Sequence, residues 1–318
     1  MTRNILLTGA SGFVGKQVLS VLKQHNHSVS VLGRSKPVQA DKFFQANLNS
    51  RTDYSKSLES IEVLIHVAAR AHVMNEQLDD PLTEYREVNN YATLNLARQA
   101  AVAGVKRFIF ISSIKVNGED SDSGRAFTYR DKHAPQDAYG VSKAEAEQAL
   151  WQLATETAME VVVIRPPLVY GPGVKANFAS MLNVAQKNLP LPLGAIYNRR
   201  SLVALDNLVD LIVTCIDHPN AANQTFLVSD DQDVSTTELL QMMTRAAGKT
   251  PRLLPVPVSW LKLVGRLTGR SAVIDRLCGN LQLDISHTKD TLGWKPPITL
   301  EEGIARCFAA KGRGFGVE

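Results

Sequence analysis

The sequence predicts an α/β fold in which a doubly wound parallel sheet is followed by a smaller carboxyl-terminal α/β lobe. Short apolar runs alternate with longer helical patterns through the first half of the chain, and this alternation is typical of βαβ units. A glycine-rich turn follows the first apolar run. From about Gly171 onward, proline and glycine interrupt the chain repeatedly, which indicates a second, loop-rich lobe.

The predicted strands are near-continuous apolar runs, as expected when helices cover both faces of a sheet. They lie at residues 5–7, 29–32, 43–46, 63–67, 108–111 and 161–164. The first connecting helix carries Val14, Val18, Val21 and Leu22 at spacings that place them on one face, toward the sheet. A second apolar stripe follows Asp206, which we expect to be the N-cap of its helix.

The turn at residues 8–15 reads TGASGFVG and lies directly between the first strand and the first helix. Gly9 permits the tight turn, Gly12 lets the backbone approach a pyrophosphate, and Gly15 allows close packing of helix and strand. The positive end of the helix dipole faces the anion. This setting predicts a Rossmann-type dinucleotide site. Its predicted cofactor contacts are Gly9, Ser11, Gly12, Phe13, Val14, Gly15, Arg34, Asn47, Leu48, Val67, Ala68, Ala69, Tyr139, Lys143 and Pro166.

The second strand ends in Gly33-Arg34 rather than in the acidic residue that grips the ribose of NAD. An arginine here binds the extra phosphate of NADP or stacks on adenine. The alternative is an exposed arginine without a ligand. We therefore predict NAD(P)(H) as the cofactor.

The change in proline and glycine content along the chain sets the expected domain boundaries. Residues 1–170 are predicted to form the NAD(P)-binding domain, to which the chain returns at about 200–230, and residues 171–318 to form mainly the substrate-binding lobe. Capping boxes at Ser235 and Glu238 and at Thr299 and Glu302 predict two helix starts in the lobe. The apolar segment Val258–Leu267 predicts a buried or dimer-facing helix, with attachment to a membrane surface as the alternative.

Composition excludes several classes of protein. The net charge is +4, but the basic residues are scattered, so we expect an anionic small substrate and no nucleic acid. No apolar run approaches the roughly 18 residues of a membrane span. Cys215, Cys278 and Cys307 are far apart, and no export signal is recognisable, which favours a reducing, cytoplasmic location. His66 and His72 have no accompanying carboxylates, so no metal site is predicted.

Three polar side chains form the predicted reaction centre. Tyr139 and Lys143 stand four residues apart on a predicted helix and therefore share a face. A nearby ammonium favours the phenolate, which makes tyrosine a usable proton carrier. Ser112 and Ser113 follow the fifth strand at the carboxyl edge, where such sheets bind ligands, and alternation along the strand makes Ser112 the weaker candidate.

Seven motifs occur in an order that resembles the extended short-chain dehydrogenase family across nearly the whole chain. They are TGASGFVG, HVAAR, VNN, ISSIKVNG, YGVSK, RPPLVYGPG and LGWKP. The resemblance implies an enzyme that acts on a nucleotide-linked sugar, with Ser113, Tyr139 and Lys143 as the catalytic residues and Asn89 as the family's helix asparagine. It also implies a homodimer through helices near 84–103 and 139–154.

The residues after the active serine separate branches of that family. Ile114 and Lys115 replace the acidic pair of its dehydratases, and a lysine cannot protonate a leaving hydroxyl as a carboxylic acid does, so we reject a 4,6-dehydratase. Reduction of a carbon-4 ketone and epimerisation through a transient ketone both remain. The missing acidic residue after the second strand favours a reductase that exchanges NAD(P)H.

The motifs SSIKVNG, RPPLVYGPG and RRSLVALDNLVD resemble reductases of a UDP-4-keto-6-deoxy-N-acetylhexosamine. Their product, UDP-N-acetylquinovosamine, supplies lipopolysaccharide O-antigen synthesis. A UDP-glucose or UDP-N-acetylglucosamine 4-epimerase is the alternative. A non-catalytic, cofactor-sensing protein is the alternative from another class, which the intact serine and tyrosine disfavour.

The resemblance also implies a set of UDP-sugar contacts. Arg200 resembles the arginine that pairs the two phosphates, although a solvated turn is the other interpretation. Asn177 and the loop at 189–193 resemble the segment that holds uridine. The predicted substrate contacts are Arg70, Ser113, Lys115, Asn177, Leu193 and Arg200.

Overall fold

A computed structural model describes residues 2–70, 80–121 and 124–312. Within them, seven parallel strands form one sheet in the order β3-β2-β1-β4-β5-β6-β9. The strands are β1 (Asn4–Thr8), β2 (Ser28–Gly33), β3 (Lys42–Gln45), β4 (Val63–His66), β5 (Arg107–Ile111), β6 (Glu160–Arg165) and β9 (Gln224–Leu227). The chain winds outward from β1 to β3 and then crosses back to β4. This reversal confirms the predicted doubly wound fold and creates a switch point between β1 and β4, where such folds bind ligands.

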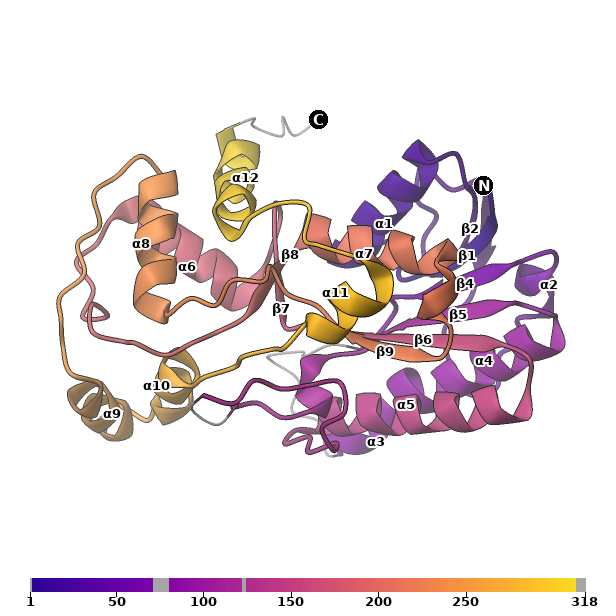
Figure 1. Cartoon of the computed structure of the whole chain (residues 1–318), viewed down its shortest axis with the longest axis horizontal. Coiled ribbons are helices and arrows are strands. Elements are labelled where there is room, and N and C mark those ends of the chain that lie inside the picture. The colour runs from indigo at the N-terminus through magenta and orange to yellow at the C-terminus, as the bar shows by residue number, and fades with distance from the viewer. Residues whose placement is uncertain (1, 71–79, 122–123, 313–318) are drawn as a thin grey trace.

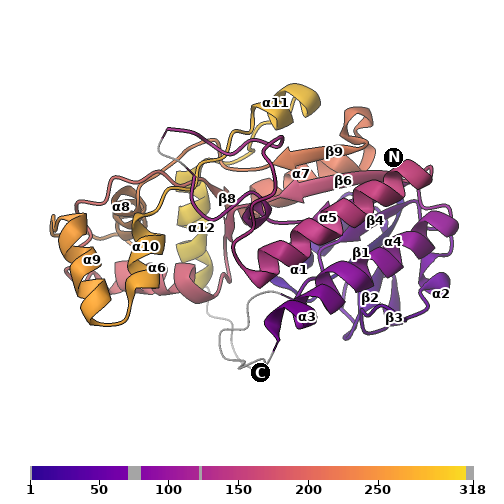
Figure 2. The same cartoon turned by 90° about the horizontal axis from the view of Figure 1, so that it is seen from below.

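Helices cover both faces of the sheet (Figures 1 and 2). One face carries α1 (Phe13–Gln24), α7 (Leu205–Asp217) and α11 (Ser286–Leu292). The other carries α2 (Ser55–Leu58), α4 (Ala92–Val102) and α5 (Ala138–Glu156), with α3 (Pro81–Arg86) and a π-helical turn η1 (Glu87–Tyr91) leading into α4. Two apolar cores, one on each face, hold these layers together.

The helix predicted after Asp206 begins two residues earlier than expected. Its first residue is Leu205, because β8 (Leu202–Ala204) runs directly into it, and the residue at the N-cap is Ala204. The predicted capping role of Asp206 is therefore wrong. Its carboxylate lies in the first turn and accepts a hydrogen bond from Arg306 at 2.7 Å instead.

The lobe after residue 170 has its own small core. β7 (Leu168–Tyr170) and β8 pair in parallel, and three helices pack around them. These helices are α6 (Ala176–Lys187), α8 (Thr236–Ala246) and α12 (Leu300–Gly312). Both predicted capping boxes are present, at Ser235 with Glu238 and at Thr299 with Glu302. The described residues also form two short 3-10 helices, η2 (Ile114–Val116) and η3 (Pro219–Ala221).

Helices α9 (Val258–Leu267) and α10 (Ser271–Cys278) lie at the end of the lobe farthest from the sheet (Figures 1 and 2). The structure corrects one of the two expectations for this segment: a buried helix is wrong, whereas a dimer-facing helix stays a prediction. Within α9 only Leu261 and Gly265 are buried, because the lobe offers it one narrow contact face, against α10. No helix in the described ranges is long and apolar enough to cross a bilayer.

Candidate active site

The glycine turn after β1 has a backbone that only glycine accommodates. Gly9 adopts a φ of +75°, and a Cβ added there would lie 2.6 Å from the amide nitrogen of Ala68. A Cβ on Gly15 would lie 2.1 Å from the carbonyl oxygen of Gly9. The same carbonyl accepts a hydrogen bond of 2.9 Å from Gly12. The turn thus brings bare backbone and the start of α1 to the edge of the sheet, which fits a pyrophosphate.

A cavity of about 660 Å³ opens at this switch point. It lies along the carboxyl ends of the central strands and extends to the start of α5. Most of the predicted cofactor residues line it: Gly9, Ser11, Gly12, Phe13, Val14, Arg34, Asn47, Leu48, Val67, Ala68, Ala69, Tyr139 and Pro166. Gly15 and Lys143 lie behind this lining rather than on it.

Sequence reasoning missed another part of the lining. These residues are Ala10, Val31, Leu32, Gly33, Ser35, Ala46, Val88, Ile111, Pro167, Val169 and Leu208, and Ser112, the weaker serine candidate, lines the cavity as well. Several lie at the end of a predicted strand or next to a predicted contact, so treating each whole strand end as lining would have found them. Val88 and Leu208 come from helices whose position depends on tertiary packing, and no local signal marks them.

The charge of the cavity suits an anionic dinucleotide. Arg34 is exposed at the end of β2, and Arg70 follows β4. Among the described residues that line the cavity, none is aspartate or glutamate. The arrangement favours phosphate binding and leaves the ribose without the acidic partner that is typical of NAD-specific sites.

His66, in its neutral form, supports the backbone that borders this cavity. Its ring lies between the hydroxyls of Thr8 at 2.9 Å and Thr93 at 3.0 Å, and so connects the end of β1 to α4. Burial lowers the pKa of His66 to about 3, and the nearby Lys143 ammonium contributes to the same shift. The hydroxyl of Thr8 also accepts a hydrogen bond from the amide of Ala68. His66 therefore fixes the cofactor cradle and carries no proton at neutral pH.

Ser113 and Tyr139 line the same cavity, one after β5 and one at the start of α5. The backbone at Ser113 is extended, and its hydroxyl accepts a hydrogen bond from the amide of Lys115 at 3.2 Å. The hydroxyl of Ser112 donates instead to the buried carboxylate of Glu147. The hydroxyl of Ser112 is thus already bonded to a buried partner, and Ser113 is the serine available to a ligand.

Burial sets the acid-base properties of the pair on α5. It raises the pKa of Tyr139 to about 12, and the Asp137 carboxylate and Tyr85 add to the rise. Lys143 is 1% exposed, with its Nζ 3.9 Å from the centroid of the Phe110 ring. Burial lowers the pKa of Lys143 to about 7, against the opposing effect of Glu147. A cation entering the cavity beside Tyr139 would favour the phenolate and make this tyrosine a proton acceptor.

A buried ion pair supports this centre from behind. The guanidinium of Arg165 binds the carboxylate of Glu147 through nitrogen atoms at 2.5 and 3.0 Å, and both side chains are almost fully buried. Arg165 also reaches Asn117 at 2.9 Å and His133 at 2.8 Å. Burial by itself raises the pKa of Glu147, but hydrogen bonding to His133 and the charge of Arg165 lower it overall. This pair joins α5 to the ends of β5 and β6.

Asn89, the predicted helix asparagine, connects α5 to the opposite wall. Its side chain exchanges hydrogen bonds of 2.8 and 3.0 Å with the backbone of Arg70 and donates to the hydroxyl of Ser142 at 3.0 Å. It lies in the π-helical turn η1, a type of irregularity that is frequent at functional sites.

The predicted substrate residues divide into two groups. Arg70 and Ser113 line the cofactor cavity. Neither this cavity nor a second cavity, which lies in the lobe, is lined by the other four, Lys115, Asn177, Leu193 and Arg200. Lys115 pairs with Glu119 at 2.8 Å and with Asp137. Arg200 donates to the carbonyl oxygens of Arg276 and Gly279. Asn177 is exposed at the start of α6, and Leu193 packs against the lobe core.

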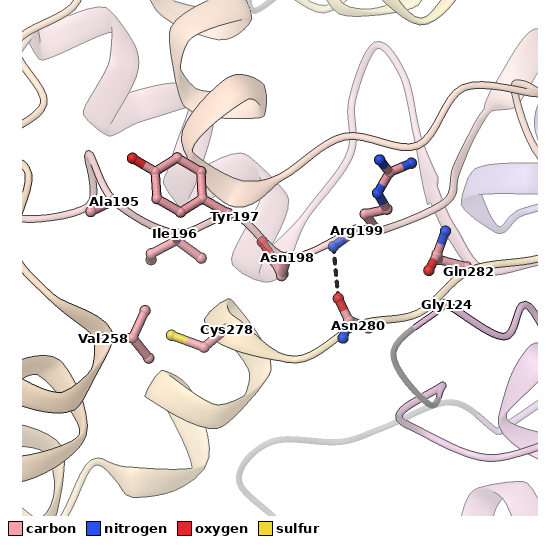
Figure 3. A pocket seen from close by; sticks show the side chains of 10 residues that line it. All are labelled: Gly124, Ala195, Ile196, Tyr197, Asn198, Arg199, Val258, Cys278, Asn280 and Gln282. Atoms are coloured by element: carbon pink, nitrogen blue, oxygen red, sulfur yellow. Dashed lines mark hydrogen bonds between the residues drawn. The ribbon is translucent and has the colours of Figure 1, made fainter.

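The second cavity, of about 690 Å³, lies between the loop that precedes β8 and the ends of α9 and α10. Figure 3 shows residues 195–199 on one side and Asn280, Gln282 and Cys278 on the other. The backbone amide of Arg199 donates to the side chain of Asn280 at 2.8 Å. The cavity adjoins the two predicted substrate residues Leu193 and Arg200 in sequence. This cavity is thus a place in the described part of the lobe where a polar ligand has room.

Metal ligands do not gather at either cavity. Over the described ranges, no group of three or more histidine, cysteine, aspartate and glutamate side chains could hold a metal ion. His66 is engaged by two threonines, and His72 lies outside the described residues.

Comparison with known proteins connects this geometry to a family. Residues 5–229 match the model of the NAD dependent epimerase/dehydratase family. A UDP-glucose 4-epimerase of Vibrio cholerae is 54% identical over 314 residues, which cover 98% of this chain and 96% of that protein.

Two solved structures share the fold. The UDP-glucuronic acid 4-epimerase of Bacillus cereus in complex with NAD has a TM-score of 0.77 at 20% identity, covering 97% of this chain and 99% of that one. The UDP-glucose 4-epimerase of Thermotoga maritima with UDP-glucose has a TM-score of 0.76 at 22% identity, covering 98% and 99%. The match to an NAD dependent family confirms the predicted nicotinamide dinucleotide cofactor. The chain is an enzyme of the short-chain dehydrogenase type and belongs to the NAD dependent epimerase/dehydratase family.

Proposed function

We propose that this enzyme inverts carbon 4 of a UDP-hexose, with UDP-glucose or UDP-N-acetylglucosamine as its substrate. The observation that carries the proposal is that Ser113 and Tyr139 line one cavity together with the glycine turn. The 54% identity to a protein named UDP-glucose 4-epimerase supports inversion over the reduction that the sequence favours.

The residues around the cavity fit the dinucleotide. The backbone at residues 9–12 and the start of α1 would hold its pyrophosphate, and Arg34 would lie near its adenosine half. A nicotinamide ring bound here would supply reversible hydride chemistry at carbon 4 of the sugar. Lys143, one helical turn beyond Tyr139, supplies a positive charge that stabilises the phenolate.

The side chains of this chain move and hold the proton. Tyr139 accepts the proton of the carbon-4 hydroxyl as the carbon–hydrogen bond breaks, and returns it when the bond forms again on the other face of the sugar. Ser113 donates a hydrogen bond to the same oxygen and holds it beside the phenol. The cycle leaves atoms and electrons balanced, with no net consumption of cofactor. The second cavity would hold the nucleotide end of the substrate, near Arg199.

A specific observation favours a second candidate function, reduction of a UDP-4-keto-6-deoxy-N-acetylhexosamine to UDP-N-acetylquinovosamine. No acidic residue stands at the end of β2, where Gly33 is followed by the exposed Arg34. A site without that carboxylate tolerates NADP(H) and suits a cofactor that exchanges after each turnover. The same three catalytic residues would serve this reaction, within lipopolysaccharide O-antigen synthesis.

The two candidates differ in cofactor balance, which one experiment measures. The purified protein is incubated with UDP-glucose, with UDP-N-acetylglucosamine and with the 4-keto-6-deoxy sugar, each with and without NADH or NADPH. Formation of the 4-epimer without net oxidation of cofactor supports the epimerase. Stoichiometric oxidation of NAD(P)H with the keto sugar alone supports the reductase. No conversion of any of the three sugars would overturn both. Tyr91→Phe, at a half-exposed tyrosine, is the matched control for Tyr139→Phe.

The proposal includes a cytoplasmic homodimer. The cytoplasm supplies both the nucleotide sugar and the cofactor. The family resemblance implies a dimer interface through helices near 84–103 and 139–154. Helices α4 and α5 of these segments lie side by side on one face of the sheet (Figure 2).

A further inference from the structure

Helix α9 presents apolar side chains to solvent. Trp260 is 66% exposed and Leu267 is 79% exposed, and Leu263 and Val264 are each about half exposed. Their spacing of three, four and seven residues places all four on one face of the helix. We call these four residues the apolar stripe. An isolated exposed leucine is ordinary, but a continuous stripe on one helix indicates a contact surface.

The apolar stripe is not the side of α9 that packs within this chain. That side carries Leu261 and Gly265, and Gly265 lets α10 approach so closely that an added Cβ would lie 2.8 Å from Ile274. Neighbouring α10 has no fully buried residue and exposes Val273 as well. The pair of helices is thus anchored on one side and open on the other.

The two helices that carry and adjoin the stripe are basic. Residues 258–278 contain four basic residues and one acidic residue, a net charge of +3, whereas the whole chain carries +4. The basic residues are Lys262, Arg266, Arg270 and Arg276. The carboxylate in this range, Asp275, lies 4.0 Å from Lys262. The two helices thus combine exposed apolar side chains with an excess of positive charge.

We propose that α9 and α10 dock this enzyme on the surface of an anionic lipid bilayer. An apolar stripe that includes a tryptophan and is accompanied by lysine and arginine is the composition of helices that lie in the membrane interface. Acidic headgroups attract the basic residues, and the stripe enters the boundary between headgroups and acyl chains. A second copy of the chain is disfavoured as the occupant, because a twofold contact through this face would bring two such positive surfaces together.

Docking through these helices would also fix where the second cavity lies relative to the membrane. Val258 at the start of α9 and Cys278 at the end of α10 both line the second cavity (Figure 3). Docking would therefore place this cavity beside the membrane surface, while the sheet, at the other end of the molecule from α9, would remain away from it (Figures 1 and 2).

Sedimentation with vesicles tests the proposal on the full chain. We expect binding to vesicles of phosphatidylglycerol and phosphatidylethanolamine and little binding to pure phosphatidylcholine. High salt should weaken the binding, because screening reduces the attraction of the headgroups. Leu263→Gln with Leu267→Gln should reduce the partition by about tenfold for each leucine. Val102→Gln, at a fully solvated valine on α4, is the matched control and should have no effect.

The charges and the tryptophan have their own variants. Arg266→Gln with Arg270→Gln should weaken binding by about fivefold for each charge, whereas Arg51→Gln with Lys56→Gln, at the far end of the molecule, should not. Anionic vesicles should shift tryptophan emission to the blue, and Trp260→Phe should remove the shift while vesicle binding persists. All positions are exposed, so thermal unfolding should be unchanged.

Three outcomes would overturn the proposal. The first is no binding to anionic vesicles at low salt. The second is binding that Leu263→Gln with Leu267→Gln leaves intact. The third is a dimer in sedimentation velocity that this double variant dissociates, without any vesicle binding, which would assign the stripe to a second copy of the chain.

Discussion

Replacing Glu147 with glutamine removes the negative charge from the ion pair buried behind the reaction centre. The guanidinium of Arg165 would keep Asn117 and His133 as partners, and neither carries a negative charge. Removing one partner of a buried pair costs about 3 to 5 kcal/mol, because the other charge is left without compensation. Both side chains are nearly inaccessible, so water cannot replace the lost carboxylate.

The expected loss is large enough to measure by thermal unfolding. A chain of this length loses roughly 1.5 °C of Tm for each kcal/mol, because unfolding entropy is about 2.1 cal/mol/K per residue. Glu147→Gln should therefore lower the Tm by about 5 to 8 °C at neutral pH. Glu145→Gln is the matched control on the same helix, since Glu145 pairs with the partly exposed Arg86. Partly exposed pairs contribute about 0.2 to 1 kcal/mol, so this control should change the Tm by about 1 °C.

The pH dependence of the Tm provides an independent check of the prediction for Glu147→Gln. The folded-state pKa of Glu147 lies below its ordinary value of 4.5, so its contribution is present above about pH 4.5 and is lost as the pH falls through the folded pKa. The difference in Tm between wild type and Glu147→Gln should therefore shrink in acid. Equal effects of the Glu147 and Glu145 substitutions, or a difference that does not change with pH, would refute the reasoning.

Three further predictions concern the cofactor and the reaction centre. Gly15→Ala should weaken NAD binding by at least about tenfold in a fluorescence titration, because its Cβ would collide with the carbonyl of Gly9. Val102→Ala, at an exposed valine that does not line the cavity, is the control and should bind normally. Arg34→Asp should shift the ratio of kcat/KM for NADP(H) and NAD(H) toward NAD by about tenfold or more, since a carboxylate repels the extra phosphate of NADP. An unchanged ratio would show that Arg34 does not contact the cofactor. In cofactor-free protein, the pKa of Lys143 lies near 7 in the folded state and near 10.5 in the unfolded state. The free energy of unfolding in urea should therefore rise as the pH increases from about 7 to 10.5, and Lys143→Met should remove this rise.

The parallel sheet is predictable from the sequence because each of its first six strands is a short apolar run next to a helical pattern. The glycine turn is equally local: the constraints on Gly9 and Gly15 act within a few residues and on the adjacent strand. The cofactor cavity follows from these two features, since parallel strands bring their carboxyl ends to one edge.

Other features depend on contacts between distant parts of the chain. The pairing of Glu147 with Arg165 joins α5 to β6. Arg165 belongs to the motif RPPLVYGPG, but nothing in the sequence marks Glu147 as its partner. The exposure of α9 is the clearest case, because an apolar segment such as Val258–Leu267 has the same composition whether a helix is buried or open. The engagement of Arg200 with the backbone of residues 276–279 likewise arises only in the folded lobe.

The fate of the hydrogen on carbon 4 tests the central claim most directly. UDP-glucose or UDP-N-acetylglucosamine carrying deuterium at carbon 4 is incubated with the enzyme, and the 4-epimer is analysed by mass spectrometry. Hydride transfer with Tyr139 as the proton carrier predicts that the epimer keeps its deuterium, and that Tyr139→Phe slows its formation by about a hundredfold or more. Exchange of the deuterium with solvent, or an undiminished rate in Tyr139→Phe, would contradict it.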